Sequence, residues 1–111
     1  MENNRQQRIA RLIQKELGEI FLLRARRMPG TIISVTNVRI SPDLAIARVH
    51  ISIFPNDKAS EILDAINADV RAIRGELGNR VHNQLRIIPE LTFFIDDSLD
   101  YLENIDNLLK K

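Results

Sequence analysis

The chain has 111 residues, of which 44% are hydrophobic and 28% charged, and this composition predicts one folded domain over residues 1–111 rather than a disordered segment. It contains no cysteine, which excludes a disulfide framework and a thiolate metal site and fits a reducing compartment. The formal net charge is only +1, but residues 1–90 carry 14 basic and 10 acidic side chains, whereas residues 91–111 carry 2 and 5.

This uneven charge distribution has two interpretations. A segregated basic surface attracts a polyanion even when the net charge is near zero. The alternative is that these charges are simply solvated. The N-terminus is polar and basic, and the longest apolar runs are too short to span a bilayer, so we expect a cytoplasmic protein without a membrane partner.

An amphipathic first helix is predicted near the N-terminus, with Asn3 or Asn4 as its cap and Pro29-Gly30 after its end. Its apolar side chains recur at spacings of three and four, which places them on one face: Ile9, Leu12, Ile13, Leu17, Ile20 and Phe21. A second stripe at similar spacing is basic: Arg5, Arg8, Arg11 and Lys15. The guanidinium fork matches phosphate oxygens, so this stripe favours nucleic-acid contact over a merely solvated helix face.

Two strands are predicted next, over residues 31–40 and 44–54, joined by a turn at Ser41-Pro42-Asp43. The short connection predicts an antiparallel hairpin. In the second strand, alternate residues from Ala45 to Ile53 form the apolar face, so Arg48 and His50 are expected on the outer face. We interpret His50 and His82 as ordinary surface residues, because neither has metal-ligand spacing around it.

A long second helix is predicted from an apolar line that passes through two glycines without a phase change: Ile62, Ile66, Val70, Ile73, Leu77 and Val81. Arg71, Arg74 and Arg80 lie off this line, and Arg86 follows the helix. Residues 73–81 match the I-x-G-x-x-G-x-x-V signature of RNA-binding KH domains, in which a glycine loop approaches the nucleic-acid backbone. Here the central residues are acidic Glu76 and apolar Leu77, which favours a continuous helix over a phosphate-clamping loop.

The stretch from Leu85 to Leu99 contains a third strand, because Leu91, Phe93, Phe94 and Ile95 form a short apolar run without helical spacing. A last helix is predicted after the cap residue Ser98, with its acidic side chains facing away from the core. The chain lacks a P-loop, a nucleotide fingerprint and a paired-histidine pattern, so we expect neither an enzyme nor a cofactor or metal.

Three stretches of this chain resemble ribosome-binding factor A: RIARLIQKELGEI, VTNVRISPDLAIARVHIS and IRGELGNRVHNQLRIIPELTFFIDDSL, which are residues 8–20, 35–52 and 73–99. The resemblance implies an α+β, type II KH-like fold, with a three-stranded sheet packed against helices in the order α-β-β-α-β-α. It also implies a bacterial assembly factor, associated with growth in the cold, that binds the free small (30S) ribosomal subunit and assists maturation of its rRNA near the 5′ end. We expect a monomer.

The chain departs from the family pattern between the two central helices, where an Ala-x-Gly kink is common. The corresponding residues are Asp69-Val70-Arg71, without glycine. A straighter helix, or a bend moved to Gly75 and Gly78, fits the apolar spacing, and the sequence leaves open whether a kink lies at residues 69–71 or at 75–78.

The family binds rRNA through a basic face rather than through a short motif, so the site residues are chosen by charge and placement. We expect phosphate contacts from two groups of side chains: Arg5, Arg8, Arg11 and Lys15, with Arg71, Arg74, Arg80 and Arg86. Such contacts give affinity that falls with salt and carries little sequence choice. Two alternatives are a generic KH-like nucleic-acid-binding module and a protein-interaction domain whose arginines are only solvated.

Overall fold

The computed structural model describes residues 4–96, and the predicted last helix lies outside them. The described elements follow the expected order, with the second helix divided in two: α1 (Asn4–Ala25), β1 (Ile32–Ile40), β2 (Ile46–Phe54), a 3-10 turn (Asn56–Lys58), α2 (Ala59–Ala68), α3 (Val70–Val81) and β3 (Glu90–Ile95). This arrangement is α+β and confirms the type II KH-like expectation up to β3. Among the described residues, no helix combines the length and the apolar character that crossing a membrane requires.

The apolar stripe of α1 is the main cover of the sheet. Ile13, Leu17 and Phe21 are fully buried along it, as the helical spacing predicts. Two glutamines tie the helix to β1: the Gln6 side chain donates to the Ile40 carbonyl over 3.0 Å, and the Gln14 side chain donates to the Val35 carbonyl over 3.1 Å. The basic stripe of α1 is thereby turned away from the sheet.

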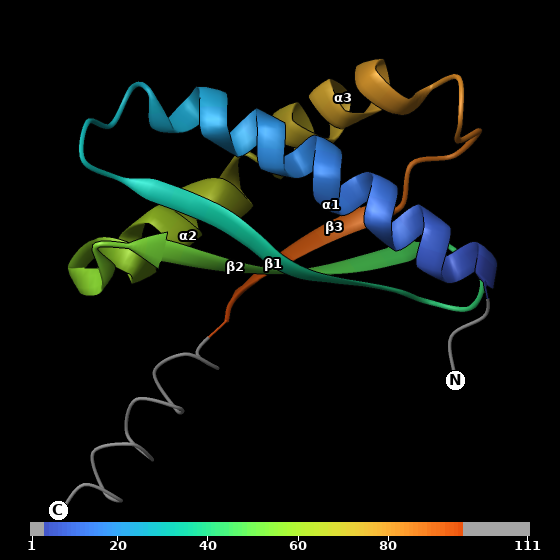
Figure 1. Ribbon diagram of the computed structural model, residues 1–111, viewed down its shortest axis with the longest axis horizontal. Helices are drawn as coiled ribbons and strands as arrows, with labels where there is room; N and C mark the ends of the chain where they lie inside the picture. The colour runs from blue at the N-terminus through green and yellow to red at the C-terminus, as the bar shows by residue number, and fades with distance from the viewer. Residues whose placement is uncertain (1–3, 97–111) are drawn as a thin grey trace, which may run out of the picture.

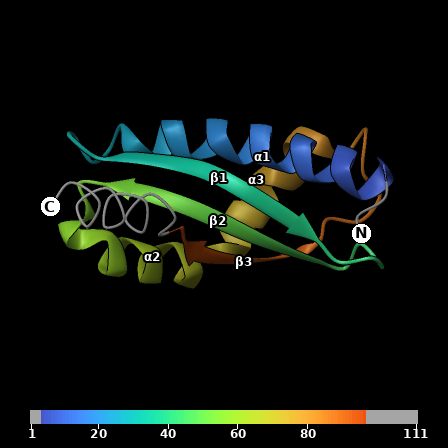
Figure 2. The same cartoon turned by 60° about the horizontal axis from the view of Figure 1, so that its bottom comes forward.

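The sheet has the order β1-β2-β3, with β2 in the centre. β1 and β2 form the predicted antiparallel hairpin, with a bulge between Val35 and Asn37, whereas β2 and β3 run parallel. A parallel pair requires a crossover connection, which α2 and α3 provide. α1 and α3 lie on one face of this sheet, and α2 lies beside the β3 edge (Figures 1 and 2).

The core lies between the helices and one face of the sheet. Alternate residues of β2 from Ala47 to Ile53 are buried there, while Arg48 and Phe54 are exposed on the outer face. Phe21 of α1 meets Phe93 of β3 edge to face, with ring centroids 5.6 Å apart. At the edge of the sheet, the Asn67 side-chain amide exchanges two 3.2 Å hydrogen bonds with the Phe93 backbone, so α2 covers part of the free edge of β3.

The expectation of a straighter central helix is wrong. α2 ends at Ala68 and α3 begins at Val70, and the residue between them, Asp69, leaves the helical region with φ −102° and ψ 16°. Its N–H is shared between the carbonyls of Ala65 and Ile66, each 3.1 Å away. The bend therefore falls at Asp69, the first of the three residues at which the resemblance places the kink, although no glycine is present.

The bend is in contact with α1. The Arg24 guanidinium donates to the Asp69 carboxylate over 2.7 Å and to the Glu76 carboxylate over 2.8 Å, so one cation joins the bend to α3. The alternative of a bend at Gly75 and Gly78 is also wrong, because α3 is continuous through both glycines. The apolar spacing passes across Asp69 because the interruption is a single residue.

Candidate nucleic-acid interface

The basic stripe of α1 is the largest group of predicted site residues that the structure keeps together. Arg5, Arg8, Arg11 and Lys15 are all exposed, on the side of α1 opposite its buried face. None of the four forms an ion pair with any residue of the range 4–96. Their spacing of three, three and four residues aligns them along two and a half to three turns, which is an arrangement suited to successive phosphates.

A second basic group borders a hollow on α3. The hollow has a volume of about 520 Å³ and is lined by Arg71, Arg74, Gly75, Gly78 and Ile88. Arg74 is partly committed to the fold, because its Nε donates to the Pro89 carbonyl over 3.1 Å and its guanidinium also donates to the Ile88 carbonyl. Arg71 is exposed and forms no ion pair within the described part of the chain.

The glycine signature in this hollow does not form a phosphate clamp. In a glycine loop, free backbone N–H groups point at the phosphate. Gly75 and Gly78 lie inside α3, where each backbone N–H falls within the ladder of i to i−4 hydrogen bonds. The hollow can therefore offer the Arg71 guanidinium to an anion, but not a row of free amides, which agrees with the prediction from Leu77.

Arg80 was predicted as a phosphate contact, and the structure places it against acids of α1. Its guanidinium lies 2.6 Å from the Glu19 carboxylate and 3.9 Å from Glu16. The Glu16 Oε2 is buried and accepts no hydrogen bond from the described residues, so Arg80 offsets a charge that burial would otherwise penalise. Arg80 joins α3 to α1, and less of its charge is available to a polyanion. Arg86 is exposed on the segment between α3 and β3.

Arg24 is another arginine whose charge is used within the fold. Partial burial lowers the pKa of Arg24, but hydrogen bonds to Asp69 and Glu76 and the charges of both carboxylates outweigh the burial, so this pKa is raised above its ordinary value. The guanidinium remains charged at every physiological pH. It links α1 to the bend residue Asp69 and to α3.

The sequence interpretation missed a pair of basic residues on the outer face of the sheet. Arg39 of β1 and Arg48 of β2 are exposed and lie directly opposite each other in the ladder. The signal was present in the strand alternation, which places Arg48 on the outer face. The register of the hairpin, which brings Arg39 next to it, could not be obtained from periodicity alone.

Among the described residues, no cluster of three or more His, Asp or Glu side chains could hold a metal ion. His82 is exposed, and its Nδ1 lies 3.0 Å from the Asn79 carbonyl oxygen. His50 differs from the expectation of an ordinary surface residue, because it is half-buried and its ring stacks on Phe94.

Comparison with known proteins identifies the family of this chain. The family model for ribosome-binding factor A matches residues 5–109. A ribosome-binding factor A from Flavobacterium psychrophilum is 47% identical over 98% of this chain and 85% of its own length. Another from Cytophaga hutchinsonii is 44% identical over 100% of this chain and 84% of its own length.

Solved structures agree with these relatives. The crystal structure of ribosome-binding factor A from Thermus thermophilus matches with a TM-score of 0.64 at 23% identity, over 81% of this chain and 94% of that one. A homology model of the Thermus thermophilus factor, fitted into a cryo-electron microscopy map of a complex of 30S with that factor, matches with a TM-score of 0.63 at 25% identity, over 78% of this chain and 89% of that one.

Proposed function

Since the chain belongs to the ribosome-binding factor A family, we propose that it binds the free small ribosomal subunit through the basic stripe of α1 and through Arg71 of α3. The Thermus thermophilus relative fitted into a map of a 30S complex supports the choice of subunit. In this proposal the chain is a cytoplasmic, monomeric assembly factor of one domain, and it assists maturation of the subunit's rRNA near the 5′ end without catalysing a reaction.

The observation that carries the proposal is the freedom of four basic side chains on one helix face. Arg5, Arg8, Arg11 and Lys15 have no ion pair to break among the described residues, so each can neutralise a phosphate and release its counterion. The opposite face of α1 is buried in the core, which holds the helix rigidly against the sheet. Phosphate contacts of this kind position a protein on folded RNA, and the shape of the RNA selects the site.

We expect the basic stripe to dominate affinity for the subunit. In the double variant Arg8→Glu/Arg11→Glu, two attractive contacts become repulsive, so binding to free small subunits should weaken by at least about tenfold at low salt. The measurement is co-sedimentation with small subunits and with whole ribosomes at two salt concentrations, after circular dichroism has confirmed folding.

The matched control is Arg26→Glu/Arg27→Glu, which makes the same charge change on exposed residues just after α1. The control should bind within about twofold of the wild type and show the same salt dependence. Unchanged binding by the Arg8/Arg11 variant would contradict the choice of surface. A wild-type chain that binds short single-stranded RNA as tightly as it binds the subunit would favour the generic KH-like module instead.

A further inference from the structure

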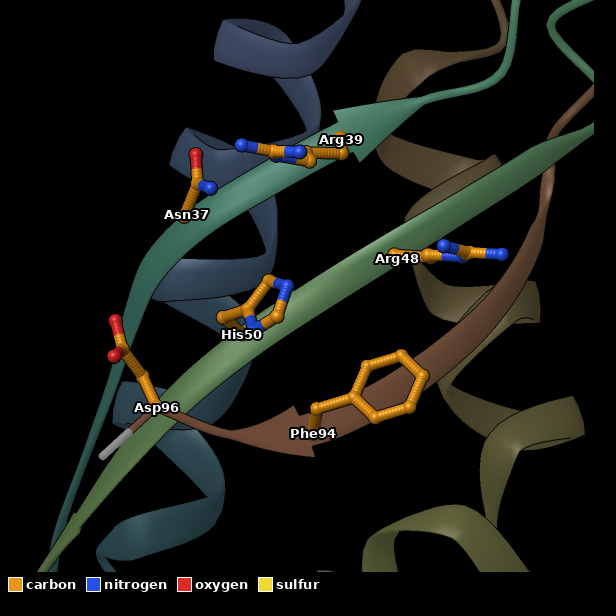
Figure 3. A pocket seen from close by; sticks show the side chains of 6 residues that line it. All are labelled: Asn37, Arg39, Arg48, His50, Phe94 and Asp96. Carbon is orange, nitrogen blue, oxygen red and sulfur yellow. The ribbon is translucent and has the colours of Figure 1, made fainter. Parts of the chain in front are cut away.

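The outer face of the sheet, on the side away from α1 and α3, bears a second group of side chains of the types that contact nucleic acids. Figure 3 shows six side chains around a hollow on this face, with both helices behind the strands. The hollow has a volume of about 420 Å³, and its lining residues come from all three strands or directly follow them: Asn37, Arg39, Arg48, His50, Phe94 and Asp96.

One end of the hollow is positively charged. Arg39 and Arg48 are partners in the antiparallel ladder, and like charges directly opposite each other destabilise a sheet. Neither guanidinium forms an ion pair with a residue between 4 and 96, so the repulsion is not relieved by the described part of the fold. A bound phosphate between the two guanidinium groups would relieve it, since each fork can donate to phosphate oxygens.

The centre of the hollow is aromatic. The His50 ring stacks on the Phe94 ring, with centroids 5.6 Å apart and an angle of 29° between the planes. Phe94 nevertheless remains 40% exposed, so part of its ring is accessible to a ligand. Exposed aromatic rings on a sheet are surfaces on which unpaired bases stack, and this contact tolerates any base because each base has a π face.

The two features lie close enough for one ligand. Arg48 and His50 are two residues apart on β2, which separates them by roughly 7 Å along the strand, and Phe94 is the partner of His50 in the parallel ladder. The phosphate and the base of one nucleotide can bridge such a separation. The Asn37 side-chain amide also lines the hollow. Asp96 lines it as well, and its carboxylate accepts a hydrogen bond from the Thr36 hydroxyl.

We propose that the outer face of the sheet binds an unpaired nucleotide of single-stranded RNA, with the phosphate between Arg39 and Arg48 and the base stacked on the Phe94 and His50 rings. The choice of RNA over DNA rests on the proposed function, whereas the contacts themselves do not. This surface lies on the opposite side of the sheet from the basic stripe of α1, so the two can bind RNA independently. A folded subunit could then be held on one face while an unpaired strand lies on the other.

The test is a titration of the full chain with a hexaribonucleotide that carries a 2-aminopurine base, whose fluorescence falls when it stacks on an aromatic ring. The wild type should quench this probe saturably at low salt. Phe94→Leu keeps an apolar side chain but removes the ring, so we expect about tenfold weaker binding and little quenching at saturation. The control is Phe54→Leu, at another exposed aromatic position of the same sheet, 66% exposed, and it should behave as the wild type does.

The charged end of the hollow is tested separately. Arg39→Gln/Arg48→Gln should reduce the slope of log K against log salt by about 0.7, as the loss of one neutralised phosphate on a single strand predicts. Arg26→Gln/Arg27→Gln, the control on exposed arginines outside the sheet, should leave the slope unchanged. Circular dichroism checks the folding of each variant, and Phe94→Tyr, which retains a ring, should keep the quenching even if Phe94→Leu is poorly folded.

Several outcomes would overturn the proposal. Absence of quenching by the wild type, equal loss in Phe94→Leu and Phe54→Leu, or an unchanged salt slope in Arg39→Gln/Arg48→Gln would each do so. Free nucleoside monophosphate that binds as tightly as the hexamer would exclude a strand, and tighter binding of the deoxy hexamer would exclude RNA. The Arg8→Glu/Arg11→Glu variant should keep the quenching, so failure of this inference and failure of the proposed function are distinguishable.

Discussion

Arg8 and Arg80 show how residues of one type acquire different functions. Arg8 extends from the exposed side of α1 without a partner among the described residues, whereas Arg80 lies 2.6 Å from the Glu19 carboxylate. The charge of Arg8 remains available to a phosphate. The charge of Arg80 is largely used to join two helices, so its replacement should act more on stability than on RNA affinity.

Asp43 in the β1–β2 turn is a second residue whose environment can be tested. The Ser41 hydroxyl donates to the Asp43 carboxylate over 2.6 Å, and the Ala45 N–H donates to the same oxygen over 3.1 Å. These hydrogen bonds, with that of Ser41 the larger contribution, lower the pKa of Asp43 below its ordinary value of 3.8. They help to hold a turn in which Leu44 has the unusual φ of 62°.

We expect the turn to loosen in acid. A carboxyl group whose pKa is lowered by folding stabilises the folded state above its unfolded pKa, and this contribution is lost as the pH falls through the lower, folded pKa. The Ala45 amide resonance should therefore shift as the pH falls below 3.8 in the wild type, and Asp43→Asn should abolish that shift. Asp64→Asn, on the exposed side of α2, should leave it unchanged. A wild-type Ala45 amide that does not respond to acid would contradict this account.

At the scale of the element, the central helix pair shows local sequence and tertiary contacts in competition. Residues 59–81 have a nearly continuous apolar line, yet the chain bends at Asp69, where Arg24 of α1 pairs with Asp69 itself and with Glu76 of α3. The two glycines, which are the local residues least suited to a helix, remain inside α3. The interruption therefore coincides with a contact to a distant arginine and not with the glycines.

Continuity of α3 predicts that Gly75→Ala stabilises the protein. A Cβ at this position would meet no heavy atom within 4 Å, and alanine is favoured over glycine in a helix interior by about 1 kcal/mol. Urea denaturation should show an increase of up to about that size in the free energy of unfolding. Gly30→Ala is the contrasting variant, because Gly30 has φ 84° and any Cβ there strains the backbone. Loss of stability in Gly75→Ala would show that α3 is not regular at this point.

At the scale of the whole molecule, a single core joins elements from distant parts of the chain. Phe21 of α1 and Phe93 of β3 meet at its centre, and both side chains are fully buried. The core holds α1 against the sheet (Figure 2), and the two proposed RNA surfaces lie on the exposed side of α1 and on the outer face of the sheet. Neither surface can keep its geometry if α1 separates from the sheet.

Truncation of the shared core should therefore unfold the molecule as a unit. Phe21→Ala removes a buried ring and should lower the free energy of unfolding by about 3–5 kcal/mol, a large fraction of the stability of a small domain. Leu22→Ala, at the neighbouring position that is 62% exposed, should change it by less than about 0.5 kcal/mol. Hydrogen exchange should show amides of α1 and β2 losing protection together in Phe21→Ala. Loss of protection in α1 alone would contradict a single core.

The amino-acid sequence by itself determined α1 and the three strands, and the faces that α1 and β2 bury. Helical spacing predicted the buried side of α1, and alternation predicted the buried side of β2, because both patterns depend only on the local geometry of the backbone. For the same reason, the basic stripe of α1 could be placed correctly on the exposed side before its surroundings were known.

The tertiary structure decided the bend at Asp69, the pairing of Arg80 with α1 and the apposition of Arg39 with Arg48. The Arg24–Asp69 contact joins residues 45 positions apart, and the Arg80–Glu19 contact joins residues 61 apart. Local sequence patterns cannot predict contacts between residues so far apart in the chain. The sequence does not indicate whether the neighbour of a charged side chain is water, a carboxylate or another arginine. Only the packing of α1 on α3 and the register of the strands assign those neighbours.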